Sequence, residues 1–363
     1  MQFGTSRFLQ AHFDLFVHEA RLEGQAVGPI TVVKTSASSE RADRVRALGD
    51  AAGFPVRIRG NRDGGVVDET VTVNSVERAL DAGRDWAAVV DCFAATIDLA
   101  VSNVGERGYE VADEHLQVDF ARPTPPRSFP GKLVALLLAR YRSGGRKLLF
   151  LPMELRPSNG QALRRAVLSL AEGAPGDFRL WLEREVVFAD TLVDRIVSEA
   201  IEPIGAIAEP YALLAVSCRG ATLPFTHPAI RLVERLEPFE RLKIHILNLG
   251  HTALADIWFR QNRPKDETVR EILADQAVAQ SLGTLYLEEV LSGFTARGMA
   301  DDAHHYIATT LERFRNPFLN HRLSDIAVNH AAKVRTRIAG FIEWVHAVEP
   351  SMPFPRLGAI AGR

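Results

Sequence analysis

The first two-thirds of the chain alternates two patterns of apolar residues. Short β-branched or fully apolar runs predict strands within 29–36, 66–75, 97–108, 147–154, 184–197 and 210–218. Apolar residues with helical spacing predict helices within 2–20, 85–95, 129–145 and 159–174. Strands and helices that alternate in this way are typical of a doubly wound, mainly parallel sheet. We therefore expect an α/β fold of the Rossmann type.

Beyond residue 235 the pattern changes to helical spacing throughout. Apolar residues recur every three or four positions in 241–261, 268–293, 304–316 and 323–348, and no convincing strand intervenes. We expect a sheet domain over 1–235 followed by a mainly α-helical domain over 236–363. A chain of 363 residues is long enough for two such domains.

Composition and charge narrow the class of protein. A formal net charge of -2 favours neither nucleic acid nor an anionic membrane as a partner. No apolar run reaches the roughly 18 residues of a membrane span, and the start lacks the pattern of a signal peptide. Cys92 and Cys218 lie in apolar contexts, as reduced core residues do. We expect a cytoplasmic enzyme or binding protein, as a monomer or a small homo-oligomer.

Three polar residues interrupt the apolar run 241–256. Written as a helix at about 100° per residue, Lys243, Asn248 and His251 share an arc of about 140°, and His245 lies outside it. A lysine on an apolar face is costly unless the site uses it. The alternative is a helix whose stray polar residues are satisfied by their neighbours.

The first turn of a Rossmann-type sheet cradles a pyrophosphate on free backbone amides at a helix start. The candidate here is Gly4-Thr5-Ser6, followed by the helix that begins with Arg7 and Phe8. It matches G-x-G-x-x-G weakly, because Ser6 replaces the second glycine and the third is absent. Only Met1 to Phe3 precede the turn, so further native residues upstream are an open alternative.

The end of the second strand indicates which dinucleotide is bound. An acidic residue there grips the ribose 2′-hydroxyl of NAD, whereas cations accept the 2′-phosphate of NADP. This strand ends in Lys34-Thr35-Ser36, with Arg41 following, and these side chains could accept a 2′-phosphate. NAD is expected with NADP possible, and Lys34 as a solvated strand end is the alternative.

Several segments in order along the chain resemble the polyol-specific long-chain dehydrogenase/reductase (mannitol dehydrogenase) family. Its signature K-x-x-x-x-N-x-x-H is matched by Lys243, Asn248 and His251. The resemblance recurs in QFGTSRF, VSNVGERGY, SFPGKLVALL, MELRPSNG, TLVDRIV, EPYALLAV, LNLGHTALA and NPFLNHRLSDIAVNHAAK. Within the family it points to the tagaturonate reductase (altronate oxidoreductase) branch. It implies a metal-independent, NAD(P)-linked enzyme that interconverts a secondary alcohol and a ketone on a sugar acid or polyol.

That reaction assigns roles to the three polar residues. Oxidation of an alcohol needs a base with a pKa near the working pH, and desolvation tunes a lysine to that range. We expect Lys243 to be the base, Asn248 to donate to the substrate oxygen, and His251 to hold the lysine or a substrate hydroxyl. Asn159 either adds a second donor or serves as a turn residue before glycine.

Further residues are expected to bind substrate and cofactor. The resemblance places Arg322 and Lys333 in a segment that contacts substrate, where they could clamp a carboxylate. Arg195 either binds substrate hydroxyls or pairs with Asp194 as a structural bridge. Arg335 and Arg337 are expected on a solvated face. The cofactor edge is expected to include Ser102, Asn103 and Glu106, while no residue set suggests a metal.

The expected function is thus an NAD(P)-dependent oxidoreductase of a sugar acid, with its site enclosed by the two domains. One alternative is a polyol dehydrogenase of the same family. Another is a dinucleotide sensor without turnover, which would have no need of a tuned lysine. A methyltransferase on a similar sheet is a remoter alternative.

Overall fold

The protein is described from a computed structural model of residues 1–363. The description omits 37–41, 112–123, 175, 218–221 and 363, so Arg41 and Cys218 lie outside it, whereas Cys92 is a half-buried free thiol. The chain forms two compact units. Unit 1 comprises Met1–Ile58, Glu69–Ala208 and Ala212–Leu236, and unit 2 comprises Arg59–Asp68, Glu209–Tyr211 and Glu237–Arg363.

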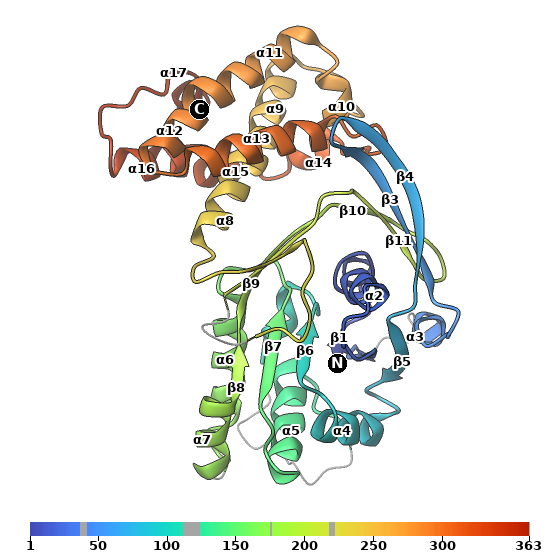
Figure 1. The fold of residues 1–363 in the computed structure, drawn as a ribbon. Coiled ribbons are helices and arrows are strands. Elements are labelled where there is room, and N and C mark those ends of the chain that lie inside the picture. Colours follow the sequence, from blue (N-terminus) through green and yellow to red (C-terminus); the bar gives the residue numbers. More distant parts are fainter. Residues whose placement is uncertain (37–41, 112–123, 175, 218–221, 363) are drawn as a thin grey trace. The chain divides into compact units, whose positions relative to one another are not determined.

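Six parallel strands form the main sheet of unit 1, in the order β5-β2-β1-β6-β7-β8 (Figure 1). Their bounds are β1 Gln2–Phe3, β2 Ile30–Lys34, β5 Val76–Asp81, β6 Leu99–Ser102, β7 Leu148–Pro152 and β8 Val186–Phe188. All residues of β2 and β7 are buried, which explains their nearly continuous apolar sequences. From β1 the chain adds β2 and β5 on one side of the sheet, and then β6, β7 and β8 on the other side. This is the arrangement of a Rossmann-type sheet, and the expected fold class is confirmed.

Helices of unit 1 cover the sheet and bury the apolar core. They are α1 Arg7–Leu9, π-helix η1 Gln10–Asp14, α2 Leu15–Leu22, α3 Ala42–Leu48, α4 Trp86–Ala95, 3₁₀ helix η3 Glu106–Tyr109, α5 Phe129–Arg142, α6 Asn159–Leu170 and α7 Gly176–Glu185. One core cluster joins residues of α4, α5, α6 and α7 to β1, β6, β7 and β8. Helix α5 starts where Ser128 caps the Gly131 amide at 3.1 Å. Its buried Arg140 satisfies the carbonyls of Phe93, Arg146 and Lys147.

The segment 184–197, expected to be one strand, is divided among three. Strand β8 ends the main sheet, β9 Asp190–Asp194 pairs antiparallel with β12 Leu213–Ser217, and β10 Val197–Ala200 pairs with β11 Ala206–Ala208. A short strand, β13 Ile230–Leu232, completes the sheet of β9 and β12. The chain leaves the main sheet at Ala189, whose amide donates to Phe150. Periodicity does not reveal a change of partner sheet.

Strands β3 Phe54–Arg62 and β4 Gly65–Val73 form a hairpin (Figure 1). Asp63 and Gly64 link them with φ of 53° and 76°, and two positive φ values are typical of the tight Asp-Gly hairpin turn. The tip of the hairpin, Arg59–Asp68, belongs to unit 2. There Asn61 donates to the Glu312 carbonyl at 3.3 Å and the Gly64 amide to the Glu312 carboxylate at 3.0 Å.

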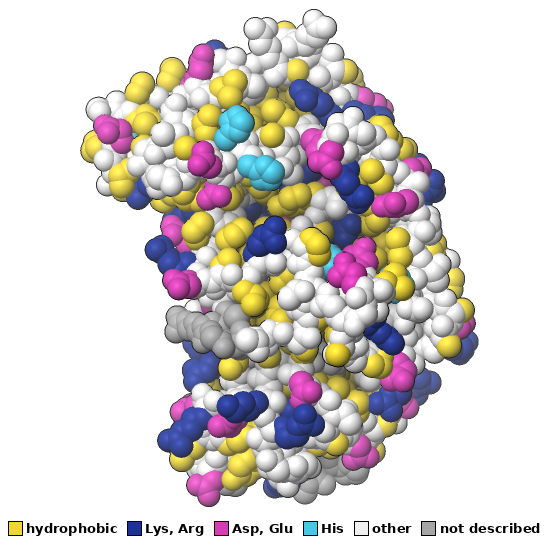
Figure 2. All heavy atoms as spheres, in the orientation of Figure 1, with side chains coloured by type: hydrophobic (Ala, Val, Ile, Leu, Met, Phe, Trp, Pro, Cys, Tyr) yellow, Lys and Arg dark blue, Asp and Glu magenta, His cyan; other side chains and the backbone are white. Residues whose placement is uncertain are grey.

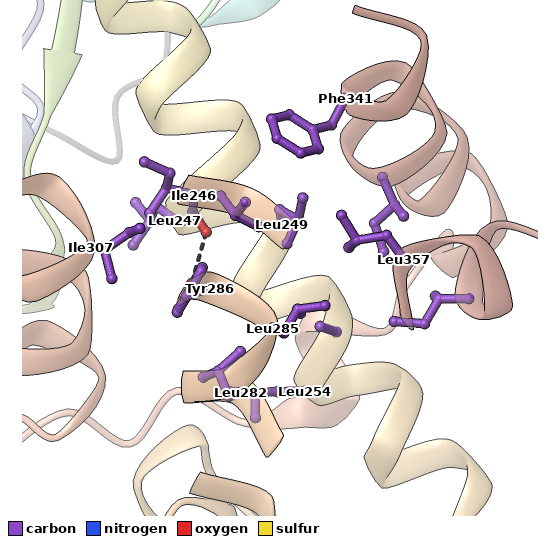
Figure 3. Close-up of a cluster of buried hydrophobic side chains, with 14 of the residues drawn as sticks. Ile246, Leu247, Leu249, Leu254, Leu282, Leu285, Tyr286, Ile307, Phe341 and Leu357 are labelled. Atoms are coloured by element: carbon purple, nitrogen blue, oxygen red, sulfur yellow. Dashed lines mark hydrogen bonds between the residues drawn. The ribbon is translucent and has the colours of Figure 1, made fainter. Parts of the chain in front are cut away.

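Unit 2 is otherwise helical, with one isolated β-bridge, Thr268 to Arg322, among the described residues. Its α-helices are α8 Glu237–Leu242, α9 Leu249–Arg260, α10 Val269–Ile272, α11 Gln276–Thr284, α12 Leu291–Ala296, α13 Ala300–Phe314, α14 Leu323–Ile326, α15 His330–Val334, α16 Gly340–His346 and α17 Pro355–Ala361. Three π-helical segments interrupt them: η4 Lys243–Asn248, η5 Leu285–Val290 and η6 Arg335–Ala339. Segment η4 contacts both η5 and η6 in the apolar core, part of which is drawn in Figure 3.

On the face shown in Figure 2, acidic and basic side chains are interspersed, in keeping with the small net charge. Within the described part of the chain, none of the helices has both the length and the apolar character that crossing a membrane requires.

Candidate active site

The turn after β1 is tight. Gly4 has a φ of 110°, and a Cβ at this position would lie 2.5 Å from the Asn103 carbonyl oxygen. Only glycine fits, as the phosphate-binding turn of a dinucleotide site requires. Ser6 caps the following helix, its Oγ accepting from the Leu9 amide at 3.3 Å. In this bond the Ser6 hydroxyl acts as an acceptor and does not use its own proton.

The other residues expected around this turn differ in exposure. Thr5 is buried, Arg7 is exposed, and Phe8 stacks on His12 with ring centroids 4.7 Å apart. An ordinary α-helix was expected after the turn, but it is interrupted by η1, Gln10–Asp14. The shape of the turn therefore depends on the backbone at Gly4 and on the cap at Ser6.

Lys34 is not a solvated strand end. It is 4% exposed, and its Nζ lies 2.9 Å from Asp81 Oδ2 and 2.9 Å from the Ser36 carbonyl oxygen. Burial raises the pKa of Asp81, but the Lys34 and Gly83 donors outweigh it and the pKa is lowered. The two residues form an ion pair at the carboxyl ends of neighbouring strands.

Ser102 is the last residue of β6 and Asn103 follows it, and both side chains bond to residues that follow β7. Ser102 Oγ donates to Glu154 at 3.1 Å, and Asn103 Nδ2 donates to the Met153 carbonyl at 2.8 Å. The buried Glu154 also accepts from the Val104 amide and from the Tyr109 hydroxyl. Burial raises the pKa of Glu154 although all three donors oppose this. Sequence reasoning missed Glu154, because only spatial contacts reveal its role in holding this edge.

Glu106, the remaining residue expected at the cofactor edge, is the first residue of η3. Arg195 directly follows β9, and its Nη1 donates to the Ala11 carbonyl at 2.7 Å. This contact ties the end of β9 to η1 and gives Arg195 a structural role within unit 1.

For Asn159 the structure supports the structural alternative over substrate binding. It is 1% exposed, and its Nδ2 donates to the carbonyls of Pro152, Glu154 and Thr191. Its Oδ1 accepts from the amides of Gly160 and Thr191 at 2.9 Å. A substrate oxygen would have to displace these bonds. Asn159 instead fastens the end of β7 to β9.

Lys243 and Asn248 are the first and last residues of the π-helix η4. An α-helix was expected here, with these residues about 140° apart. In a π-helix the hydrogen bond runs from residue i+5 to residue i, as from the Leu249 amide to the Ile244 carbonyl. The wider turn brings residues five apart to the same side of the helix. Lys243 and Asn248 thereby lie closer to the same side of the helix than they would in an α-helix, and both residues are half-buried.

The other π-helical segments stabilise this turn. Tyr286 of η5 donates its hydroxyl to the Ile246 carbonyl at 2.9 Å (Figure 3). Arg337 of η6 donates to Thr252 Oγ1 at 3.1 Å and to the Asn248 carbonyl at 3.4 Å. Arg337 was expected on a solvated face; the structure places it against the helix that carries the polar residues.

His245 points away from these residues. Its Nδ1 lies 3.0 Å from the Arg337 carbonyl oxygen, so that nitrogen carries the proton, and the ring stacks on Trp344. Burial lowers the pKa of His245 to about 4, so the ring is neutral and structural.

His251 is 7% exposed in α9, and its ring lies 4.4 Å from Phe314 and 4.9 Å from His321, centroid to centroid. Burial lowers the pKa of His321, Asp325 opposes the shift and Lys333 adds to it. His321 thus lies against His251 and close enough to Lys333 to feel its charge. Sequence reasoning missed His321, although it lies beside Arg322 in the segment expected to bind substrate.

Arg322 and Lys333 differ in setting. Arg322 is exposed at the N-cap of α14. Lys333 is half-buried, donates to the Ile326 carbonyl at 2.7 Å, and has a pKa lowered by burial and by Arg337. Among the described residues no group of three or more His, Cys, Asp or Glu side chains is arranged to hold a metal ion.

The family profile of the mannitol dehydrogenase Rossmann domain matches residues 1–220, and that of the mannitol dehydrogenase C-terminal domain matches residues 235–358. An altronate oxidoreductase of Halalkalibacterium halodurans is 30% identical over 93% of this chain and 69% of its own length. One of Bacillus subtilis is 28% identical over 93% of this chain and 73% of its own length.

Solved structures show a similar fold. A D-sorbitol dehydrogenase in substrate-free form has a TM-score of 0.76 at 17% identity, over 99% of this chain and 85% of that one. The mannitol 2-dehydrogenase of Pseudomonas fluorescens, in a ternary complex with NAD and D-mannitol, has a TM-score of 0.69 at 19% identity, over 99% and 82%. The resemblance inferred from sequence is confirmed: the chain belongs to the mannitol dehydrogenase family of oxidoreductases.

Proposed function

We propose that the protein is an NAD-dependent dehydrogenase that interconverts a secondary alcohol and a ketone on a sugar acid related to altronate and tagaturonate. Residues 1–235 serve as the dinucleotide-binding domain and 236–363 as the substrate domain. The relatives named altronate oxidoreductase support this substrate class. The observation that carries the proposal is the π turn, whose ends are Lys243 and Asn248.

The chemistry follows from that alignment. Bound NAD supplies the hydride acceptor, so the protein has to remove the hydroxyl proton. Lys243, as the general base, takes that proton on its Nζ. The Asn248 amide donates to the same oxygen as negative charge develops on it. His251 orients the lysine or a neighbouring substrate hydroxyl.

A sugar acid also needs a cation remote from the reacting carbon. Lys243 cannot serve, since a permanent ion pair with the substrate would raise its pKa and spoil it as a base. Lys333 and Arg322 provide the candidates. The lowered pKa of Lys333 reflects an ammonium that burial and Arg337 disfavour, and a carboxylate would stabilise that ammonium.

The test is a panel of aldonates, uronates and alditols assayed with NAD or NADH by nucleotide absorbance. The proposal expects the highest kcat/KM for an acid of the altronate type. A preference for a neutral alditol would instead make the protein a polyol dehydrogenase of the same family. Tight NADH binding without turnover of any substrate would favour the dinucleotide sensor.

A further inference from the structure

The ion pair of Lys34 and Asp81 is built into the main sheet. The two residues are register partners on the parallel strands β2 and β5, each the last residue of its strand. The side chain of Lys34 is 4% exposed and that of Asp81 is 13% exposed. Asp81 Oδ2 faces the ammonium at 2.9 Å, and Oδ1 accepts from the Gly83 amide at 2.8 Å. The carboxylate is thus held in place and still reaches the surface.

The pair lies where a dinucleotide's adenosine ribose is distinguished. Strand β2 neighbours β1, and the Gly4 amide, just after β1, donates to the Val33 carbonyl at 2.9 Å. In Rossmann-type sheets the residue at the end of this second strand meets the ribose 2′ position. A lone lysine there would attract the 2′-phosphate of NADP. Here the lysine already has a carboxylate partner.

We propose that Asp81 masks the charge of Lys34 and so makes the site selective for NAD over NADP. The inference rests on the proposed function as a dinucleotide-dependent enzyme. A phosphate monoester carries about −1.5 to −2 charge near pH 7 and would meet a pair of zero net charge whose less buried member is an acid. A ribose 2′-hydroxyl, in contrast, can donate to the Asp81 carboxylate. The selectivity thus comes from the neighbouring strand and not from β2 itself.

The test compares the Kd values of NADH and NADPH by calorimetry in four proteins: wild type, Asp81→Asn, Asp81→Asn with Lys34→Met, and Asp91→Asn. Asp91 is an exposed acid of α4 and controls for the loss of one negative charge. One charge-assisted contact contributes about 1.5–3 kcal/mol, or roughly 10- to 150-fold. Asp81→Asn should strengthen NADPH binding relative to NADH by about this factor. The double variant should lose the gain, and Asp91→Asn should match wild type.

The outcomes separate the inference from the function. If wild type binds neither nucleotide, the proposed function fails and the inference with it. If NADH binds and Asp81→Asn leaves the ratio of the NADPH and NADH Kd values unchanged, only the inference is overturned. The inference is also overturned if the double variant, which lacks Lys34, keeps the gain in NADPH affinity. Should Asp81→Asn not fold, Lys34→Gln provides the second test, since it bares the carboxylate. It should weaken NADPH binding relative to NADH, and an unchanged ratio overturns the inference.

Discussion

Arg313 grips the carboxylate of Glu209 with two hydrogen bonds, from Nη2 to Oε1 at 2.7 Å and from Nε to Oε2 at 3.0 Å. Both side chains are at most 4% exposed, and the guanidinium also lies 4.4 Å from the centre of the Tyr211 ring. Glu209 comes from the short segment between β11 and β12, while Arg313 belongs to α13. The pair fixes this connecting segment in unit 2.

Removing one partner of this pair should be strongly destabilising, because the other charge is then buried without compensation. Glu209→Gln should lower the free energy of unfolding by about 3–5 kcal/mol, measured by urea denaturation. Asp98→Asn, which breaks the exposed Arg146–Asp98 pair, is the control and should cost about 1 kcal/mol or less. Equal small losses in both variants would show that Glu209 does not anchor the unit.

The π turn depends on a matched glycine and tyrosine. A Cβ on Gly250 would collide with the Tyr286 hydroxyl, which donates to the Ile246 carbonyl. Gly250→Ala should cost about 1–3 kcal/mol through overpacking. Tyr286→Phe should cost about 0.5–1.5 kcal/mol by removing one hydrogen bond to the Ile246 carbonyl, which still accepts from the Leu249 amide. Since Tyr286→Phe removes the nearest of the colliding atoms, the double variant should cost less than the sum of the two losses, whereas strict additivity would contradict the coupling.

Lys243→Ala should reduce turnover by a factor on the order of 10² to 10⁴, the usual contribution of a general base. NADH affinity and circular dichroism should change little, because the residue is assigned to the reaction and not to the fold. Lys265→Ala, at an exposed lysine of unit 2, is the matched control and should leave turnover unchanged. Turnover near wild type in Lys243→Ala would mean that another group is the base, whereas rescue by a small added amine would support the assignment.

Substrate charge can be tested at Lys333 and Arg322. Loss of a charge-assisted contact should depress kcat/KM for an aldonate by roughly 10- to 150-fold in each alanine variant, and barely affect a neutral alditol. The more buried Lys333 should show the larger effect, since a desolvated charge interacts more strongly. Equal losses on the acid and the alditol would assign these residues to the fold.

Asp14 should make stability depend on pH. Burial raises its pKa from 3.8 to about 8, opposed by Gln2, and its Oδ1 has no hydrogen-bond partner among the described residues. Between about pH 4 and pH 8 the folded state therefore holds a proton that the unfolded state has lost. Stability should fall as pH rises through this window, by at most about 1.4 kcal/mol per pH unit.

The comparison uses Asp14→Asn, which keeps the shape and cannot ionise. The stability of wild type relative to this variant should decline from pH 4 to pH 8 and then level off. Burial also lowers the pKa of His12 to about 3 and of His245 to about 4, which makes stability rise with pH in the acid range. That contribution is common to both proteins and cancels. A difference independent of pH would show that Asp14 is ionised in the folded protein.

Apolar patterning predicted the fold class, strands β2, β6, β7 and β8 of the parallel sheet and most helices, because the burial of both faces of β2 and β7, and of one face of each helix, sets the spacing of apolar residues. It did not predict β5, and the strand expected within 66–75 is β4, which belongs to another sheet. It also brought Lys243 and Asn248 together as candidates. It could not predict the π turn, since the extra residue per turn is stabilised by Tyr286 and Arg337, which are distant in sequence. The hydrogen bonds of the Asn159 amide and the ion pair of Lys34 with Asp81 are likewise contacts between strands, which local spacing cannot predict.

The division of unit 2 into three stretches, Arg59–Asp68, Glu209–Tyr211 and Glu237–Arg363, has a consequence for biosynthesis. The chain is made from its N-terminus, and domains generally fold as units as they emerge from the ribosome. The hairpin tip and Glu209 leave the ribosome well before α13, which carries their partners Glu312 and Arg313, has been synthesised. Unit 2 therefore completes its folding after the sheet of unit 1 has been made. A fragment that starts at Glu237 would lack Glu209, the partner of Arg313. A fusion protein that carries only residues 237–363 therefore does not contain the whole of unit 2.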